Sequence, residues 1–121
     1  MAITPTQRSL QKLRAEGYLA TVTERWNPYA RVRQDLFGFV DILALRDGET
    51  LAIQTTTASN FAARRKKVLA HENFDAVICA GWQVVVHGWR KNKAGKWELK
   101  EAFMKPQENV LRCENTTAIN E

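Results

Sequence analysis

The chain has 121 residues and a formal net charge of +5, which results from 18 Lys plus Arg and 13 Asp plus Glu. This length is typical of one domain with one hydrophobic core; 45% apolar and 26% charged residues exclude a disordered or fibrous chain, and two cysteines exclude a disulfide scaffold. Because no stretch approaches about 18 apolar residues and the polar N-terminus lacks a signal-peptide core, we expect a cytoplasmic protein without a membrane span.

The pattern of apolar and turn-forming residues predicts a single domain over residues 1–104 and a polar tail over residues 105–121 that frays. The expected elements are, in chain order, a helix from Thr4 to Gly17, strands over residues 18–26, 36–45 and 51–57, a helix capped by Ser59 or Asn60 that runs to about Ala70, a short helical segment over residues 72–80, and strands over residues 82–89 and 97–104. Asn27-Pro28 breaks the first strand before a basic connection. The fold class is therefore α/β (α+β), in the order helix, strand, strand, strand, helix, strand, strand, with a mixed sheet flanked by helices.

Basic residues gather in three clusters, whereas the tail is acidic. Residues 105–121 hold two Lys or Arg and three Glu, a net charge of −1, so residues 1–104 carry +6. The clusters are Arg31 and Arg33; Arg64, Arg65, Lys66 and Lys67; and Arg90, Lys91, Lys93 and Lys96. Each cluster alone is compatible with a solvated face or with a phosphate-binding surface, and three in one small domain favour phosphate binding.

The central hairpin predicts how side chains meet inside the two most apolar segments. If Asp47-Gly48 is a two-residue turn, Asp41 faces Gln54 directly, and both share one face with Thr56. A carboxylate, an amide and a hydroxyl then lie in one buried cluster, whose charge requires compensation.

Two ways of compensating Asp41 are open. In the first, the Gln54 NH2 group or an arginine donates to the carboxylate. In the second, Asp41, the Gln54 side-chain carbonyl and the Thr55 backbone carbonyl hold a divalent metal ion, since oxygen ligands suit Mg²⁺. Asp35, six residues upstream, adds a second carboxylate if its loop folds over the site.

Three short motifs follow one another in a definite order: Arg31-Val32-Arg33, then Gly38-Phe39-Val40-Asp41 at a strand, then Gln54-Thr55-Thr56 on the next strand. With the order of elements, these motifs resemble the PD-(D/E)XK nuclease superfamily, and within it the archaeal-type Holliday junction resolvases. Members carry a basic stretch, Gly-x-x-Asp, and then Glu-x-Lys. The resemblance covers residues 4–69.

The resemblance implies a restriction-endonuclease-like core and metal-dependent hydrolysis of DNA phosphodiester bonds, with Mg²⁺ or Mn²⁺ as cofactor. Asp41 matches the metal-binding aspartate, Gln54 stands in place of the second acid and Thr56 in place of the lysine, and these three are the catalytic candidates. The metal candidates are Asp41, Gln54 and Thr55. The nucleic-acid-binding candidates are Arg31, Arg33, Arg64, Arg65, Lys66, Lys67, Arg90, Lys91 and Lys93. A base that substitutes for the lysine would come from the helix after the second strand of the hairpin, as Arg64, Lys66 or Lys67, or would be Lys91.

The resemblance also implies that the partner is DNA, including branched DNA, and that the protein forms a homodimer. The family is often phage-borne. No membrane partner is expected. Because the second acid and the lysine are replaced, the alternative is a catalytically degenerate nuclease fold that binds nucleic acid or a protein. A third reading is an interaction protein whose last hairpin pairs with a partner or with its own copy. We expect His87 to be structural.

Overall fold

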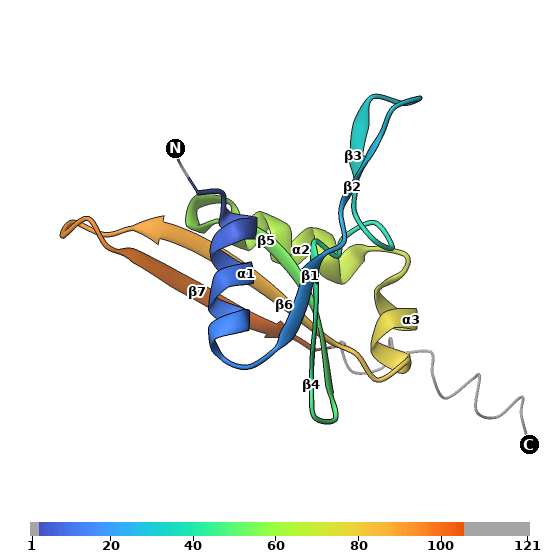
Figure 1. Ribbon diagram of the computed structural model, residues 1–121. Helices are drawn as coiled ribbons and strands as arrows, with labels where there is room; N and C mark the ends of the chain where they lie inside the picture. The colour runs from blue at the N-terminus through green and yellow to red at the C-terminus, as the bar shows by residue number, and fades with distance from the viewer. Residues whose placement is uncertain (1–2, 106–121) are drawn as a thin grey trace, which may run out of the picture.

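The computed structural model describes residues 3–105, so the predicted tail beyond Lys105 lies outside the described residues. A five-stranded sheet in the order β1-β4-β5-β6-β7 forms the centre, and a separate two-stranded hairpin, β2–β3, projects from it (Figure 1). The elements are α1 (Pro5–Ala15), β1 (Leu19–Val22), β2 (Arg25–Asn27), β3 (Val32–Gln34), β4 (Ile42–Arg46), β5 (Glu49–Thr57), the 3-10 turn η1 (Ala58–Asn60), α2 (Phe61–Ala70), α3 (Phe74–Cys79), β6 (Gln83–Lys91) and β7 (Trp97–Met104).

The sheet is mixed. β1, β4 and β5 are antiparallel, β6 is parallel to β5, and β7 is antiparallel to β6. β5 and β6 can be parallel because the chain crosses back over the sheet through α2 and α3 between these two strands. The predicted class of a mixed sheet flanked by helices, with both helices and the last two strands in the expected order, is confirmed.

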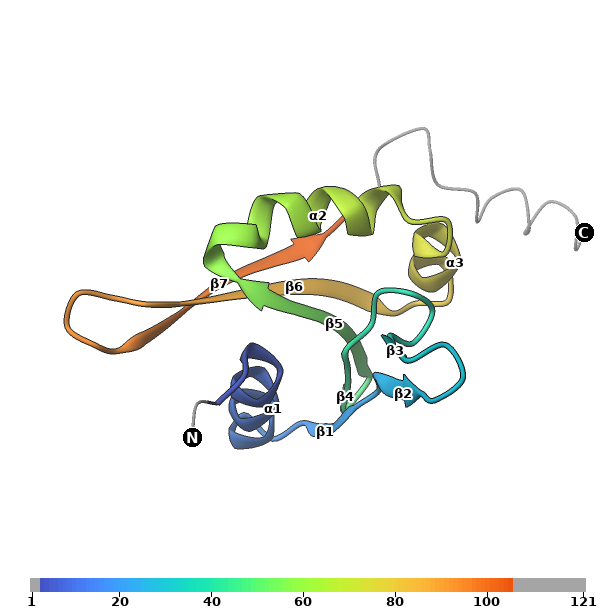
Figure 2. The ribbon, with the colours of Figure 1, turned by 90° about the horizontal axis from the view of Figure 1, so that it is seen from above.

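The helices cover opposite faces of the sheet, α1 on one side and α2 with α3 on the other (Figure 2). Alternate residues of the central strands feed two apolar clusters. On the α1 face, Ile42, Ile53 and Val85 pack against Leu13. On the other face, Ala52, Val84 and Val86 pack with Val68, Phe61 and Phe74. Both faces of β5 and β6 are therefore buried. None of the helices within residues 3–105 is both long and apolar enough to cross a membrane.

Helix α1 begins as predicted. The Thr4 side-chain oxygen accepts a hydrogen bond from the Gln7 backbone N–H at 3.2 Å, and Pro5 occupies the first helical position. The alternation over residues 18–26, however, does not form one strand, and that prediction is wrong. β1 ends at Val22. The N–H of Thr23 still donates to the Asp41 carbonyl and its hydroxyl donates to the Val40 carbonyl, at 2.8 Å each, and the chain then leaves the sheet to form β2.

The apolar run over residues 36–45 is also only partly a strand. Its first half, residues 36–40, is a tight turn closed by reciprocal hydrogen bonds between Leu36 and Val40. Phe37 and Gly38 adopt positive φ angles of 55° and 91° there, which a strand does not permit. The run is apolar because Phe39 and Val40 enter the core from this turn, not because the segment is extended.

Candidate functional site

The β4–β5 hairpin has the predicted register. Arg46 pairs with Glu49, and Ile42 pairs with Ile53, across the Asp47-Gly48 turn. Asp41 immediately precedes β4, and its N–H donates to the Ile53 carbonyl at 2.8 Å. The observed pairing therefore brings the Asp41 side chain against Gln54, as the two-residue turn predicts.

The Asp41 carboxylate is only 4% exposed and is held by three donors on β5. Its Oδ2 atom accepts hydrogen bonds from Gln54 Nε2 at 2.7 Å, from the Thr55 N–H at 2.9 Å and from the Thr55 hydroxyl at 3.1 Å. The Thr55 hydroxyl also contacts the Thr6 hydroxyl of α1 at 2.7 Å. The amide compensation is thus present, and Thr56, which is also buried, is not among these donors.

Two further carboxylates lie beside Asp41. Single oxygen atoms of Glu24, Asp35 and Asp41 all come within 4.8 Å of one another; we call these three residues the acid cluster. Glu24 directly precedes β2 and Asp35 directly follows β3, so the base of the projecting hairpin brings both to Asp41. The loop of Asp35 folds over the site, which is the condition under which the sequence allows a second carboxylate there, whereas sequence analysis did not select Glu24.

The acid cluster is electrostatically strained. Burial, and next the adjacent Asp35 carboxyl, raise the pKa of Asp41 to about 8, although the Thr55 N–H opposes this shift. Arg33 pairs with the cluster on its exposed side, where its Nη1 lies 3.6 Å from Glu24 Oε1. Among the described residues, the three carboxylates of the acid cluster therefore have one cationic partner, Arg33. A bound proton or metal ion would neutralise the remaining negative charge.

The chemistry of the acid cluster fits a divalent cation. Three carboxylates offer the hard oxygen ligands that Mg²⁺ and Mn²⁺ prefer, and a divalent cation would offset the negative charge that they bring together. This ligand set differs from the set expected from sequence. Gln54 directs its NH2 group to Asp41, and the same group lies 3.4 Å from the Thr55 carbonyl, so Glu24 and Asp35 are better placed as ligands than Gln54 and Thr55.

A basic cavity of about 450 Å³ opens on the α2 side of Gln54. Its wall includes Gly38, Gln54, His71 and two bases, Arg64 and Lys67, with one acid, Glu72. Gln54 therefore joins the two halves of the site, since its amide binds Asp41 and its side chain also lines the cavity. Of the four bases predicted on this helix, Arg64 and Lys67 face the cavity, while the neighbouring Arg65 and Lys66 are exposed elsewhere on α2.

His71 is a residue of the cavity that sequence analysis did not select. Its Nδ1 accepts a hydrogen bond from the Asn73 N–H at 3.1 Å. In the neutral ring, Nε2 therefore carries the proton, and this atom lies against Gly38: a Cβ atom at Gly38 would be only 2.3 Å from it. No spacing in the sequence indicates this contact, which arises from the turn at residues 36–40.

The remaining predicted bases lie far from one another. Arg31 is at the tip of the β2–β3 hairpin, whereas Arg90, Lys91 and Lys93 belong to the β6–β7 hairpin at the opposite end of the molecule (Figures 1 and 2). Arg90 is paired with Glu98 at 3.0 Å. One surface around the acid cluster can therefore include the first two predicted basic clusters but not the third.

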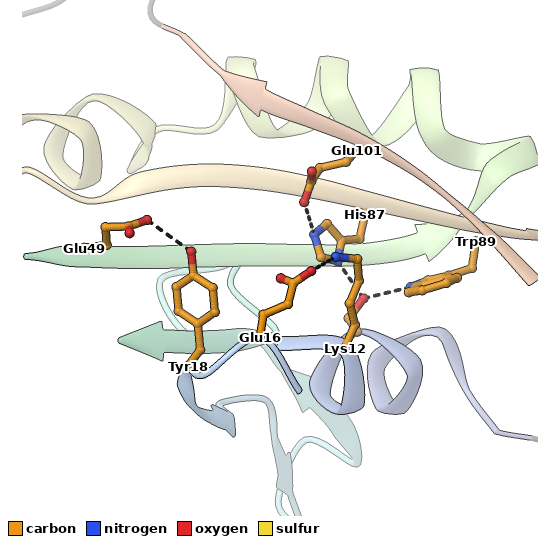
Figure 3. Close-up of polar contacts among 8 residues, drawn as sticks. Lys12, Glu16, Tyr18, Glu49, His87, Trp89 and Glu101 are labelled. Atoms are coloured by element: carbon orange, nitrogen blue, oxygen red, sulfur yellow. Dashed lines mark hydrogen bonds and ion pairs between the residues drawn. The ribbon is translucent and has the colours of Figure 1, made fainter. Parts of the chain in front are cut away.

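His87 is structural, as predicted (Figure 3). Its Nδ1 lies 2.8 Å from the Ser9 hydroxyl and its Nε2 lies 2.9 Å from Glu101, while Trp89 Nε1 donates to Ser9 at 2.8 Å. Burial lowers the pKa of His87, and Glu101 opposes this. Because Ser9 and His87 are buried, this network joins α1 to the sheet and offers no access to a substrate.

Comparison of the sequence with protein-family models gives no match, and comparison with curated proteins also gives none. A function must therefore be inferred from the geometry of the site and from the resemblance of its motifs.

Proposed function

We propose that the protein is a metal-dependent nuclease that hydrolyses DNA phosphodiester bonds at the acid cluster. The observation that carries this proposal is the convergence of Glu24, Asp35 and Asp41 within 4.8 Å, beside a cavity lined by Arg64 and Lys67. Carboxylates that bind a metal and bases that bind phosphate are the two components that phosphodiester hydrolysis requires.

The arrangement of elements supports a restriction-endonuclease-like core. The order α1, β1, β4, β5, α2, β6, β7 is the order that the resemblance implies, with the β2–β3 hairpin and α3 as additions. By the resemblance, Asp41, just before β4, and Gln54 on β5 match the family's aspartate and second acid. In this proposal, Glu24 and Asp35 compensate for the acid that Gln54 replaces.

Each residue of the site has a distinct role in this proposal. Glu24, Asp35 and Asp41 would hold Mg²⁺ or Mn²⁺, which would polarise a phosphate and lower the pKa of bound water. Arg64 and Lys67 bind the phosphate backbone, a contact that positions DNA without reading its sequence. Gln54 keeps the Asp41 carboxylate oriented through the bond between Nε2 and Oδ2.

The experiment is a cleavage assay on linear duplex, branched and single-stranded DNA with Mg²⁺ or Mn²⁺. Asp41→Asn and Asp35→Asn should each reduce cleavage by at least about 100-fold, since each removes a metal ligand. Asp47→Asn is the matched control: Asp47 is exposed in the β4–β5 turn, and Asn-Gly suits that turn equally well. Cleavage that survives in both site variants would refute the assignment.

One observation favours a second candidate, a degenerate nuclease fold that only binds nucleic acid. Oδ2 of Asp41 is already saturated by Gln54 and Thr55, and a threonine stands at the position of the family's lysine. This candidate predicts no cleavage of any DNA but affinity that falls steeply with salt concentration. The homodimer that a two-fold symmetric junction implies is tested by light scattering in the same buffers.

A further inference from the structure

We propose that the β2–β3 hairpin is a DNA-binding arm whose tip residue, Tyr29, stacks on an unpaired base a few nucleotides from the cleaved phosphate. The arm comprises residues 25–34. This inference deepens the proposed function, and it rests on that function for the location of the phosphate at the acid cluster.

The arm exposes aromatic side chains that the rest of the fold does not cover. The hairpin projects away from the sheet and its helices (Figure 1). Tyr29 at the tip is 97% exposed, and Trp26 on β2 is 56% exposed. Covering the exposed face of a large aromatic ring with a binding partner removes apolar surface from water, which favours binding.

The tip is ordered without a partner. The Asn27 side-chain oxygen accepts hydrogen bonds from the Tyr29 and Ala30 N–H groups at 2.9 and 3.1 Å, and its carbonyl accepts from the Arg31 N–H at 2.7 Å. Pro28 restricts the backbone further. Arg31 adopts a φ of 55°, a strained value for an arginine. A rigid turn thus holds Tyr29 outward, which reduces the entropy lost when a ligand binds.

The charge of the arm fits a polyanion. Residues 25–34 contain three arginines and no acid. Arg33 faces Glu24, while Arg25 and Arg31 are exposed. A hollow of about 720 Å³ at the base of the arm is lined in part by Arg25, Arg33 and Asp35, so positive charge continues from the arm to the acid cluster.

The faces of the arm argue against a lipid or an apolar protein partner. Trp26 is paired with Arg33, whereas Val32 is paired with Asn27, so the two apolar side chains of the strands lie on opposite faces. Each apolar residue is thus opposed by a polar or charged one, and no continuous apolar surface forms. Isolated aromatic rings between arginines are the arrangement that binds unpaired bases.

The position of the arm relates the stacked base to the acid cluster. Glu24 and Asp35 lie at the two ends of the arm, and the chain from Glu24 to Tyr29, which turns after Asn27, spans at most roughly 16 Å. At about 3.4 Å of rise per nucleotide, the base on Tyr29 lies within roughly five nucleotides of the phosphate. Bases within a duplex are already stacked on both faces, so the partner is a nucleotide in a single strand or at a branch.

The test is fluorescence anisotropy in EDTA with two probes, a blunt duplex and the same duplex carrying a single-stranded tail. Tyr29→Ala should weaken binding of the tailed duplex by about 5- to 100-fold, the range for one lost base–aromatic stack, and leave the blunt duplex unchanged. Tyr29→Phe should bind both like the wild type. Phe103→Ala, which removes an exposed aromatic ring on β7 outside the arm, is the matched control and should bind both probes like the wild type, and thermal unfolding of each variant confirms that it folds.

Equal binding of the tailed duplex by the wild type and Tyr29→Ala would overturn the inference, as would equal losses on both probes. Binding to vesicles of phosphatidylcholine and phosphatidylserine that requires Tyr29, with no effect on DNA, would overturn it in favour of a membrane partner. The cleavage assay separates the two proposals. Tyr29-dependent binding without cleavage contradicts the nuclease but not the arm, and cleavage with Tyr29-independent binding contradicts the arm alone. A wild type that binds neither probe contradicts both.

Discussion

Gln54 Nε2 lies 2.7 Å from Asp41 Oδ2, so the side-chain amide of Gln54 donates a hydrogen bond to a buried acid. The acids that complete the cluster come from a different part of the chain, the two legs of the β2–β3 hairpin, which carry Glu24 and Asp35. The candidate metal site therefore combines one acid beside β4 with two acids from the base of the hairpin. Because three acids meet at this site, the free energy of unfolding should depend on substitutions that change their charge, on pH and on divalent metal ions.

Gln54→Glu should destabilise the protein when no divalent ion is present. The change replaces a hydrogen-bond donor to Asp41 with a fourth acid, which costs about 1–3 kcal/mol. Mn²⁺ should recover most of that loss, because an ion that binds only the folded state stabilises it. Urea unfolding with and without Mn²⁺ measures both effects. Gln83→Glu, at an exposed position, is the control, and equal stability of the two variants without metal would contradict the proposed cluster.

The stability of the metal-free protein should fall as pH rises between about 4 and 8. The pKa of Asp41 is about 8 in the folded state, against an ordinary value of 3.8 for an aspartate, so the folded state keeps a proton that the unfolded chain releases. The contribution is complete below about pH 4 and is lost as pH rises through the folded pKa, with a slope of up to about 1.4 kcal/mol per pH unit. Asp41→Asn should flatten this dependence in urea titrations. A variant profile parallel to that of the wild type would show that Asp41 ionises normally.

Ser9→Ala should destabilise the fold without affecting the candidate site. It leaves Trp89 Nε1 and His87 Nδ1, both buried, without their shared partner, and one unsatisfied buried group costs about 1–3 kcal/mol. The midpoint of urea unfolding reports this loss, and DNA binding should not change. Ser59→Ala removes an exposed hydroxyl contact and should have almost no effect; a similar small effect of Ser9→Ala would mean that the network is not a structural link.

His87 adds a pH dependence of opposite sign to that of Asp41. The pKa of His87 is lowered from 6.5 in the folded state, so the unfolded chain binds more protons below that value. The stabilising contribution is present above about pH 6.5 and is lost as pH falls through the folded pKa. In the Asp41→Asn background, the free energy of unfolding should therefore decrease toward acid pH. His87→Gln should remove this remaining decrease, and a decrease that persists would place its origin elsewhere.

Gly38→Ala should disturb the site through His71. Gly38 and Gly81 share a φ of 91°, which L-residues rarely adopt, but only Gly38 has a neighbour: a new Cβ atom would lie 2.3 Å from His71 Nε2. Gly81→Ala therefore measures the backbone strain alone, about 1–2 kcal/mol. Gly38→Ala should cost more than this and shift the His71 ring resonances in NMR spectra. Equal losses from the two variants would show that His71 moves aside freely.

The sequence predicts the elements whose signals are local. The cap of α1, the Asp47-Gly48 turn and the β4–β5 register all follow from short motifs, and this register is enough to place Asp41 beside Gln54. Glu24 could not be found in this way, because the polar–apolar alternation continues past Thr23. The chain leaves the sheet after Thr23, where Thr23 is hydrogen-bonded to residues 40 and 41, a contact distant in the sequence.

The orientation of the second basic cluster and the formation of the arm also depend on contacts distant in the sequence, so the sequence alone does not predict them. Four bases in a row on α2 give no indication that Arg64 and Lys67, but not their neighbours, line the cavity, because that depends on how the helix rests on the sheet. The strand over Val32–Gln34 is short and polar, and it forms only because it pairs with β2. The positive φ of Phe37 is likewise set by the turn and not by the residue.

The most direct test of the acid cluster as a metal site is anomalous diffraction from crystals soaked in Mn²⁺. We predict one strong peak within coordinating distance of the carboxylates of Glu24, Asp35 and Asp41, with the Gln54 amide still bound to Asp41, and loss of that peak in Asp35→Asn crystals. The absence of a peak at the acid cluster, or a peak that persists in Asp35→Asn, would contradict the proposed metal site.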